Sequence, residues 1–515
     1  MPLMLLSEYW IESESIVGDI LVGLVLLEGK KERKGTLNNK SIGKNYLYNM
    51  AYQVLVMILP LVTTPYISRV LGAANIGSYS YTQSIVYYFT LFGTLGLNLY
   101  GQREIAYVQD DTEKRSKVFW EVLFIRIITH AFSLAVFCTT FVHHTKYGLL
   151  FTIQIIDIIA SCIDVSWFFQ GMEDFKRLTI RNILIKLCAV ICIFGFVKVP
   201  NDIYKYAICY SASLILGNAV MLVYLPRLIE KIRIRELNFK KHIKPCIILF
   251  LPQIATSLYN VLDKTMIGML TQIEEEVAYY EQAQKIVKVA LSFLTSIGTV
   301  MLPRIAFVFS KKDFSAIESY MQKSFRYAFL LGIPLTLGMI AAASHLVPWF
   351  YGPGYEKVIP NIMIIAPIIL IVGLSNVIGV QYLLPTGRQR DYFISVITGA
   401  VANVALNAVL IPRLFSVGAA LGSVFAEFVV LLAQMILTKK DIKYFKVIKT
   451  SVKYWFAGIV MFIAVSFPFI NCADSIITSL MQIVVGCGSY FVILVLLREE
   501  IIVDIIDKLR RKKNV

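Results

Sequence analysis

About fourteen apolar stretches, each of roughly 20 residues, follow one another between Tyr46 and Leu497. Hydrocarbon offers no water to satisfy backbone N–H and C=O groups, so such stretches can cross a bilayer only as helices. The sequence therefore predicts an all-α polytopic membrane protein. The predicted spans are 45–68, 79–100, 118–142, 148–169, 178–198, 203–225, 245–270, 277–302, 323–343, 358–384, 389–412, 416–438, 452–470 and 476–497.

Lysine and arginine concentrate in every second connection between these stretches. The connection 227–244 is strongly basic, for example, whereas 271–276 has no cation. Cytoplasmic loops of membrane proteins carry the excess of Lys and Arg. The basic connections are therefore expected to face the cytoplasm, and an even number of spans places both termini there.

Composition limits the functions that the chain can have. Hydrophobic residues make up 57% of its 515 residues, so spans and short loops leave no room for a soluble catalytic domain, and we expect no enzyme. The net charge of +16 lies in loops that flank apolar helices, which favours anionic membrane lipids over nucleic acid as a partner. The eight cysteines lie mostly inside apolar spans without paired spacing, so we expect neither a metal site nor a cofactor.

The sequence contains an internal repeat at an offset of 201 residues. At this offset Tyr79, for example, aligns with Tyr280. Six spans separate the two copies, and an even-numbered repeat keeps the same orientation in the membrane. The pattern predicts two parallel six-helix bundles around a central cleft, plus two C-terminal helices. The predicted domains are an N-terminal extension (1–42), a first bundle (43–226), a basic cytoplasmic linker (227–244), a second bundle (245–440), two extra helices (450–497) and a basic cytoplasmic tail (498–515).

Several stretches, in the expected order, resemble a known family. They are 65–72 (PYISRVLG), 164–176 (DVSWFFQGMEDFK), 382–388 (YLLPTGR), 407–412 (NAVLIP) and 418–422 (GAALG). Together they resemble bacterial capsule and O-antigen repeat-unit flippases. These form the polysaccharide transporter family of the multidrug/oligosaccharidyl-lipid/polysaccharide superfamily.

The resemblance implies an alternating-access flippase in the bacterial cytoplasmic membrane. Its substrate would be an undecaprenyl-pyrophosphate-linked oligosaccharide, moved from the inner to the outer leaflet. A polysaccharide polymerase and glycosyltransferases are the further partners that it suggests. Neither the sugar composition nor the energy source follows from it.

Ionisable side chains inside predicted spans are costly, so each needs a partner, a wet cavity or a function. Lys285 and Lys288 lie three residues apart on one helix face, and Lys264 lies at a similar depth. We expect them to bind the pyrophosphate, since a lysine is a compact charge that can bind and release phosphate. The stretch 280–285 also resembles the lipid II flippases, in which an arginine that contacts substrate stands where this chain has lysine. The alternative is a structural ion pair between Lys285 and Asp263.

The predicted first bundle contains two more cations and two carboxylates. Arg126 and Lys186 are further candidates for substrate binding, but Asp164 at a similar depth gives an internal salt bridge as the alternative. Asp157 lies nearer mid-membrane, and Glu427 lies near the middle of span 416–438. Both are candidates for ion coupling, and a protonated packing carboxyl is the alternative for Glu427.

Two other functions are compatible with parts of this pattern. An ion-coupled drug or metabolite antiporter of the same superfamily would share the architecture, although intramembrane cations favour an anionic lipid headgroup. A membrane-embedded polysaccharide polymerase or glycosyltransferase would use large outer loops, and the predicted outer loops are short. The sequence also lacks a G-x-x-x-x-G-K-[ST] phosphate loop, which excludes ATP hydrolysis through that motif.

Overall fold

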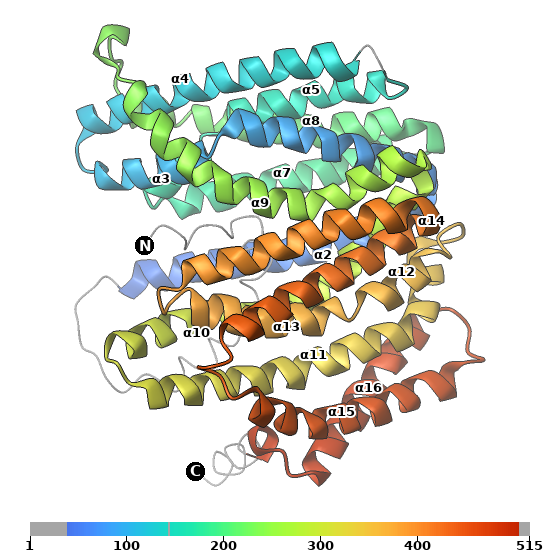
Figure 1. Cartoon of the computed structure of the whole chain (residues 1–515). Coiled ribbons are helices and arrows are strands. Elements are labelled where there is room, and N and C mark those ends of the chain that lie inside the picture. The colour runs from blue at the N-terminus through green and yellow to red at the C-terminus, as the bar shows by residue number, and fades with distance from the viewer. Residues whose placement is uncertain (1–38, 143–144, 504–515) are drawn as a thin grey trace. The chain divides into compact units, whose positions relative to one another are not determined.

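The computed structural model describes residues 39–142 and 145–503 (Figure 1). Within these ranges the regular structure is helical, and ten helices are long and apolar enough to cross a membrane. The predicted class, an all-α polytopic membrane protein, is confirmed. The count of fourteen spans stays a prediction, and the predicted extension and tail lie largely outside the described residues.

The described residues divide into two compact units, 39–278 and 279–503. The first unit contains α2 (Asn39–Thr94), α3 (Leu97–Tyr107), α4 (Thr112–Phe137), η1 (Cys138–Val142), α5 (Gly148–Cys162), α6 (Ser166–Gly171), α7 (Phe175–Phe196), η2 (Pro200–Asp202), α8 (Ile203–Leu222), η3 (Leu225–Arg227), η4 (Ile234–Glu236) and α9 (Lys240–Thr271). The helix α10 (Glu274–Ser310) begins in the first unit and continues into the second. The second unit also contains α11 (Phe314–Tyr351), α12 (Val358–Ile365), α13 (Ile368–Ile378), η5 (Gly379–Leu383), α14 (Gln389–Leu437), α15 (Tyr444–Ser466), η6 (Phe467–Phe469) and α16 (Ile476–Leu496).

Two of the long helices are each a pair of helices joined at a sharp break. In α2 the break is Gly72, with φ 76° and ψ 168°, and in α14 it is Phe415, with φ 55° and ψ −130°. Glycine adopts such a φ at little cost because it has no Cβ. Both breaks fall between two predicted spans, so each merged helix corresponds to two of them.

Two predicted spans contain interruptions. The predicted span 148–169 consists of α5 and α6, separated at Ile163 to Val165. The predicted span 358–384 consists of α12, α13 and the π-helix η5, and Pro367 precedes α13. Proline lacks the N–H that would continue the helix. In both places the polypeptide leaves carbonyl groups that need other donors.

Aromatic residues of the 164–176 stretch anchor the interrupted span in the first unit. Trp167 and Phe168 of α6 are fully buried, and the Trp167 ring stacks on Phe119 of α4 at 5.6 Å between centroids. A Cβ on Gly101 of α3 would lie 2.5 Å from the Trp167 ring. The three helices thus fit closely around one tryptophan.

The linker predicted at 227–244 is docked on α4. Arg115 donates to the Leu228 carbonyl at 2.6 Å, and Trp120 donates to the Glu230 carbonyl at 2.9 Å. Glu121, which is fully buried, accepts from the Asn238 backbone N–H and pairs with His242. The linker is therefore an ordered part of the first unit and not only a solvated connection.

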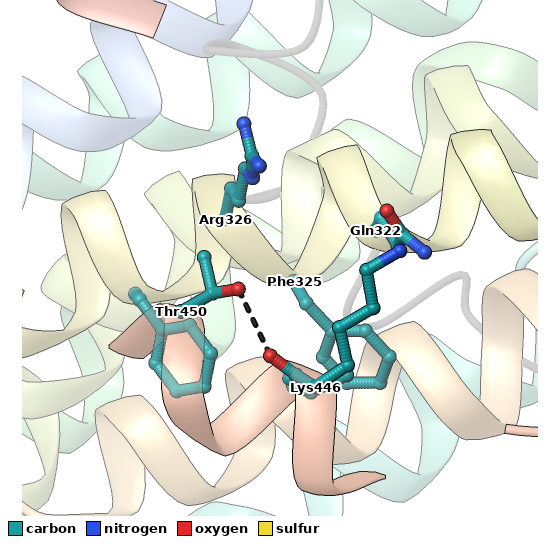
Figure 2. Close-up of a pocket in the computed structure, with 7 residues that line it drawn as sticks. Gln322, Phe325, Arg326, Lys446 and Thr450 are labelled. Carbon is teal, nitrogen blue, oxygen red and sulfur yellow. Dashed lines mark hydrogen bonds between the residues drawn. The ribbon is translucent and has the colours of Figure 1, made fainter. Parts of the chain in front are cut away.

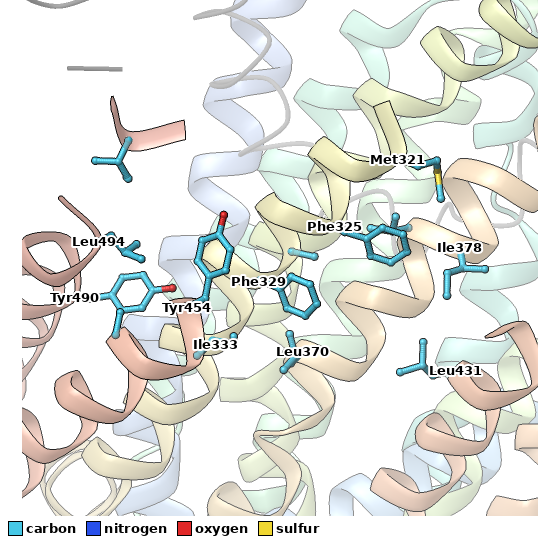
Figure 3. Packing of buried hydrophobic residues seen from close by; sticks show 14 of the residues in the cluster. Met321, Phe325, Phe329, Ile333, Leu370, Ile378, Leu431, Tyr454, Tyr490 and Leu494 are labelled. Carbon is cyan, nitrogen blue, oxygen red and sulfur yellow. The ribbon is translucent and has the colours of Figure 1, made fainter. Parts of the chain in front are cut away.

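The second unit has one large apolar core (Figure 3). The predicted C-terminal pair of helices, α15 and α16, packs on α11 and supplies part of this core. The residues labelled in the figure are Met321, Phe325, Phe329 and Ile333 of α11, Leu370 and Ile378 of α13, Leu431 of α14, Tyr454 of α15, and Tyr490 and Leu494 of α16.

Candidate functional site

Lys285 and Lys288 lie on the exposed face of α10. The opposite face is a continuous buried stripe that includes Tyr280, Ala283 and Val287. The Lys285 side chain is 46% exposed, and its Nζ lies 3.1 Å from the Glu281 carboxylate one turn earlier. Lys288 is exposed and also makes an electrostatic or polar interaction. The two lysines therefore extend the same way from a helix that the second unit holds along its other side.

The exposure of these lysines limits what can surround this face of α10. Lys285 is 11 residues after the start of the helix, which corresponds to about 16 Å along its axis. A lysine at the centre of a membrane helix costs about 2.5–3.5 kcal/mol on insertion scales when it faces lipid. Two exposed lysines on one face are stable there only if that face meets water or an anionic group.

Polar contacts hold the orientation of α10 in the second unit. The Tyr280 hydroxyl lies 2.8 Å from the Ser423 hydroxyl of α14 and accepts from Gln284 at 2.6 Å. Tyr351 of α11 donates to the Gln282 carbonyl at 2.9 Å. Because Tyr280 and Gln282 are buried, these bonds fix the rotation of the helix and hence the direction of its lysine face.

Asp263 is buried on α9 in the first unit. Nearby on α9, Thr265 lies 3.1 Å from the Tyr88 hydroxyl and donates to the Ser84 hydroxyl of α2 at 2.9 Å. Asp263 lies close enough to Tyr88 to act on it electrostatically. Asp263 and Lys285 belong to different units, so the ion pair suggested between them stays a prediction.

Arg126 stabilises the interrupted span of the first unit. Its side chain is 1% exposed, and the guanidinium donates twice to the Ser161 carbonyl, at 2.6 and 3.0 Å, and once to the Asn98 amide oxygen at 2.6 Å. Ser161 lies in the last turn of α5, where carbonyl groups have no partner within the helix. These contacts favour a structural role for Arg126, and its predicted contact with substrate stays a prediction.

Asp164 pairs with Arg181 of α7. The carboxylate lies 3.0 Å from the guanidinium, which also donates to the Asn218 amide oxygen of α8 at 3.0 Å. Asn218 in turn donates to the Ala160 carbonyl of α5 at 2.8 Å. The break between α5 and α6 is thus connected to α7 and α8, through an arginine that the sequence analysis did not assign to this cluster.

Asp157 is 8% exposed on α5, and neither carboxylate oxygen has a hydrogen-bond partner in the described residues. The other candidates, Lys186, Lys264 and Glu427, are partly buried, and each makes a polar or electrostatic interaction. Their predicted roles in substrate binding or ion coupling stay predictions. Sequence reasoning did not single out Gln154 or Ser211 beside Asp157, although Gln154 precedes Asp157 by one helical turn in an apolar span.

A polar clamp joins the predicted outer ends of helices in the first unit. Lys146 lies 2.6 Å from the Glu274 carboxylate, to which Tyr147 also donates at 3.0 Å. The hydrogen bond to Glu274 raises the pKa of Lys146, because it stabilises the charged ammonium. A Cβ on Gly77 of α2 would lie 1.7 Å from the Glu274 carbonyl oxygen. The second half of α2 and the start of α10 thus meet backbone to backbone.

A small pocket lies between α11 and α15 (Figure 2). Gln322, Phe325 and Arg326 line it from α11, and Lys446 and Thr450 line it from α15. Arg326 forms an ion pair with Glu500, which lowers the pKa of that carboxyl. The pocket combines two cations with aromatic surface at the ends of the helices that the sequence predicts to be cytoplasmic.

Comparisons with known proteins agree with this fold and also indicate a family. The family model described as Polysaccharide biosynthesis protein matches residues 42–309, and the model named MatE matches 249–409. An Escherichia coli K12 protein named "Putative O-antigen transporter" is 27% identical over 390 residues, which cover 75% of this chain and 93% of that protein. A Shigella dysenteriae protein of the same name is 24% identical over 394 residues, which cover 76% and 95%.

Solved structures show the same fold at lower identity. The lipid II flippase MurJ in an inward closed conformation matches with a TM-score of 0.68 at 15% identity, over 88% of this chain and 99% of that one. An inward-facing multidrug resistance MATE family transporter matches with a TM-score of 0.57 at 12% identity, over 77% and 100%. The polysaccharide biosynthesis model covers more than half of the chain and bears out the family expected from the sequence stretches. The chain therefore belongs to the polysaccharide biosynthesis protein family.

Proposed function

We propose that this protein moves lipid-linked oligosaccharide repeat units across the membrane as a flippase. The observation that carries the proposal is membership of the polysaccharide biosynthesis family, with O-antigen transporters as relatives along three quarters of the chain. The protein is a multi-pass membrane transporter and not an enzyme. The lipid carrier that we propose is undecaprenyl pyrophosphate, and the location is the bacterial cytoplasmic membrane, with transport from the inner to the outer leaflet.

Lys285 and Lys288 are the proposed contacts for the pyrophosphate. Their support is that both are exposed on one face of α10 whose other face is buried. Two lysines three residues apart present two positive charges to a group with at least two negative ones. Glu281, which pairs with Lys285, would be exchanged for a phosphate oxygen.

The finer architecture that we propose has fourteen spans in two parallel six-helix bundles, two extra helices and cytoplasmic termini. The breaks at Gly72 and Phe415 support this count, because each divides one long helix into two lengths that could span a bilayer. Anionic membrane lipids are further proposed partners, with the pocket beside Arg326 and Lys446 as a contact. A polymerase and glycosyltransferases that supply and use the same repeat unit are the remaining proposed partners.

A drug antiporter is the second candidate, because the MatE model matches residues 249–409. The exposed lysines of α10 disfavour cationic drugs, which they would repel. The two functions can be distinguished by expressing the protein in a strain whose own repeat-unit flippase has been deleted. If the protein is a flippase, it should restore surface polysaccharide and leave drug susceptibility unchanged. Increased drug resistance without surface polysaccharide would support the antiporter.

Charge substitutions on α10 test the proposed headgroup contacts in the same strain. The double variant Lys285→Gln, Lys288→Gln is expected to reach the membrane at normal abundance and to lose export. The matched control is Lys311→Gln, Lys312→Gln, two exposed lysines just beyond the end of the same helix, which should export normally. Full export by the α10 variant would remove both lysines from the mechanism.

The structural alternative predicts a different pattern. If Lys285 is the ion-pair partner of Asp263, neutralising either residue alone should lower membrane abundance, because a buried charge loses its partner. Neutralising both together should then restore abundance and export. If Lys285 instead contacts the headgroup, Lys285→Arg should retain part of the export. Asp263→Asn should then not rescue Lys285→Gln.

A further inference from the structure

Gln154 and Asp157 lie on one face of α5, three residues apart. Asp157 is nine residues after the start of the helix, which corresponds to about 14 Å along its axis. The helix packs against α8, and the Ser211 side chain of α8 faces the Asp157 carboxyl. A carboxylate, an amide and a hydroxyl from two helices thus come together in the first unit, in the middle of two predicted spans.

These three side chains are buried without hydrogen-bond partners. Gln154 and Ser211 are fully buried, and Asp157 is 8% exposed. By distance and angle, both carboxylate oxygens, both amide atoms of Gln154 and the Ser211 hydroxyl lack a hydrogen-bond partner among residues 39–142 and 145–503, although Ser211 is near enough to the Asp157 carboxyl to interact with it. Most buried polar atoms in folded proteins are paired, so five unpaired atoms at one place require an explanation.

The next carboxylate along the chain, in the break after α5, shows what is missing at Asp157. Asp164, seven residues later, is compensated by Arg181 and by the Ser166 hydroxyl. An uncompensated carboxylate in a low-dielectric interior costs several kcal/mol, so it either takes up a proton or acquires a counter-charge. The unpaired acceptors here are two carboxylate oxygens, one amide oxygen and one hydroxyl oxygen, and small hard cations prefer such oxygen ligands.

We propose that Gln154, Asp157 and Ser211 form a binding site for a monovalent metal cation of the size of Na⁺. One carboxylate neutralises one positive charge, whereas a divalent ion in an oxygen site usually recruits more carboxylates. The described residues contain no group of three His, Cys, Asp or Glu side chains that could hold a metal ion, which also disfavours a transition metal. The site would let a cation gradient act on the helices α5 and α8.

This inference goes beyond the proposed function and is independent of the proposed substrate. It concerns the first unit alone, and cation binding can be measured on the purified full chain without any oligosaccharide. Failure of cation binding would leave the flippase proposal intact, and failure of export would leave the cation site intact.

The test measures binding of radioactive ²²Na⁺ and the sodium dependence of thermal unfolding, with choline chloride as the reference salt. Asp157→Asn, which is nearly isosteric, is expected to abolish saturable ²²Na⁺ binding, and Ser211→Ala to weaken it severalfold. Sodium should raise the unfolding temperature of the unmodified protein, because a ligand that binds only the native state stabilises it. That rise should disappear in Asp157→Asn.

Ser213→Ala is the matched control for Ser211→Ala. Ser213 is buried on the same helix, but its hydroxyl donates to the Cys209 carbonyl at 2.6 Å, so its loss should leave ²²Na⁺ binding unchanged. If Asp157→Asn does not fold, this serine pair carries the test. Equal ²²Na⁺ binding by the two serine variants, or no saturable binding by the unmodified protein, would overturn the proposal. Stabilisation by acid that Asp157→Asn removes, without any sodium effect, would show a proton site instead and would also overturn it.

Discussion

Arg126 stabilises the end of α5, which lies inside the predicted span 148–169. Its guanidinium supplies the donors that the last turn of α5 lacks, and it is buried while doing so. Arginine suits this place because its fixed fork of N–H groups reaches two acceptors at once, Ser161 and Asn98. The contacts of this buried cation therefore favour a structural role, in which it holds the interrupted span in shape.

Removing this arginine should therefore destabilise the protein. Arg126→Leu is expected to lower the free energy of unfolding by on the order of 2–4 kcal/mol, because two partly buried acceptors lose their donors. Arg126→Lys should show an intermediate loss, since an ammonium cannot bridge both acceptors in the same way. Thermal unfolding of the purified variants measures this, with Arg390→Leu at an exposed position as the control. A stable Arg126→Leu that fails only in export would instead assign Arg126 to the substrate path.

At this scale the sequence predicted which residues are unusual but not what they contact. Depth along a span identified Arg126 and Asp164, yet the partner of Asp164 is Arg181, which lies in the predicted inner end of span 178–198. Contacts between helices depend on their rotation and on breaks such as that at Ile163 to Val165. Neither has a hydropathy signal in a single sequence.

The close approach of α2 to the start of α10 depends on a residue without a side chain. Gly77→Ala would place a Cβ 1.7 Å from the Glu274 carbonyl oxygen, so the two helices would have to separate. We expect a loss of unfolding free energy of about 1–3 kcal/mol, as for overpacking in a well-packed interior. Thermal unfolding against Gly488→Ala provides the comparison, because that helical glycine has nothing within 4 Å of a new Cβ and alanine favours helix. Equal unfolding temperatures for the two variants would contradict this packing.

Helices as elements were largely predictable because a bilayer permits few alternatives. The observed helices are longer than the predicted spans where polar turns extend beyond the apolar stretch, as in α11, which begins at Phe314 instead of 323. Hydropathy reports only the apolar part of a helix. It also does not detect the π-helices η1 and η5, because hydropathy does not distinguish one kind of helix from another.

The described residues of the whole molecule form two compact units, and the two parallel bundles stay a prediction. Each unit contains a predicted span that is interrupted, α5 with α6 in the first unit and α12 with α13 in the second.

The orientation that we propose depends on the distribution of basic loops. Reporter fusions after Lys244 and after Thr271 are expected to give opposite signals, cytoplasmic for the first and external for the second. The same signal from both would contradict the topology.

Transport of the lipid-linked repeat unit itself is the most direct test of the central claim. The lipid-linked oligosaccharide from the producing cells would be reconstituted into liposomes with the purified protein, and the fraction accessible to an impermeant sugar-modifying reagent would be measured. We predict that the accessible fraction rises from the share in one leaflet toward the whole pool. The Lys285→Gln, Lys288→Gln variant should leave it at the level of protein-free liposomes. An accessible fraction that the unmodified protein does not change would contradict the account.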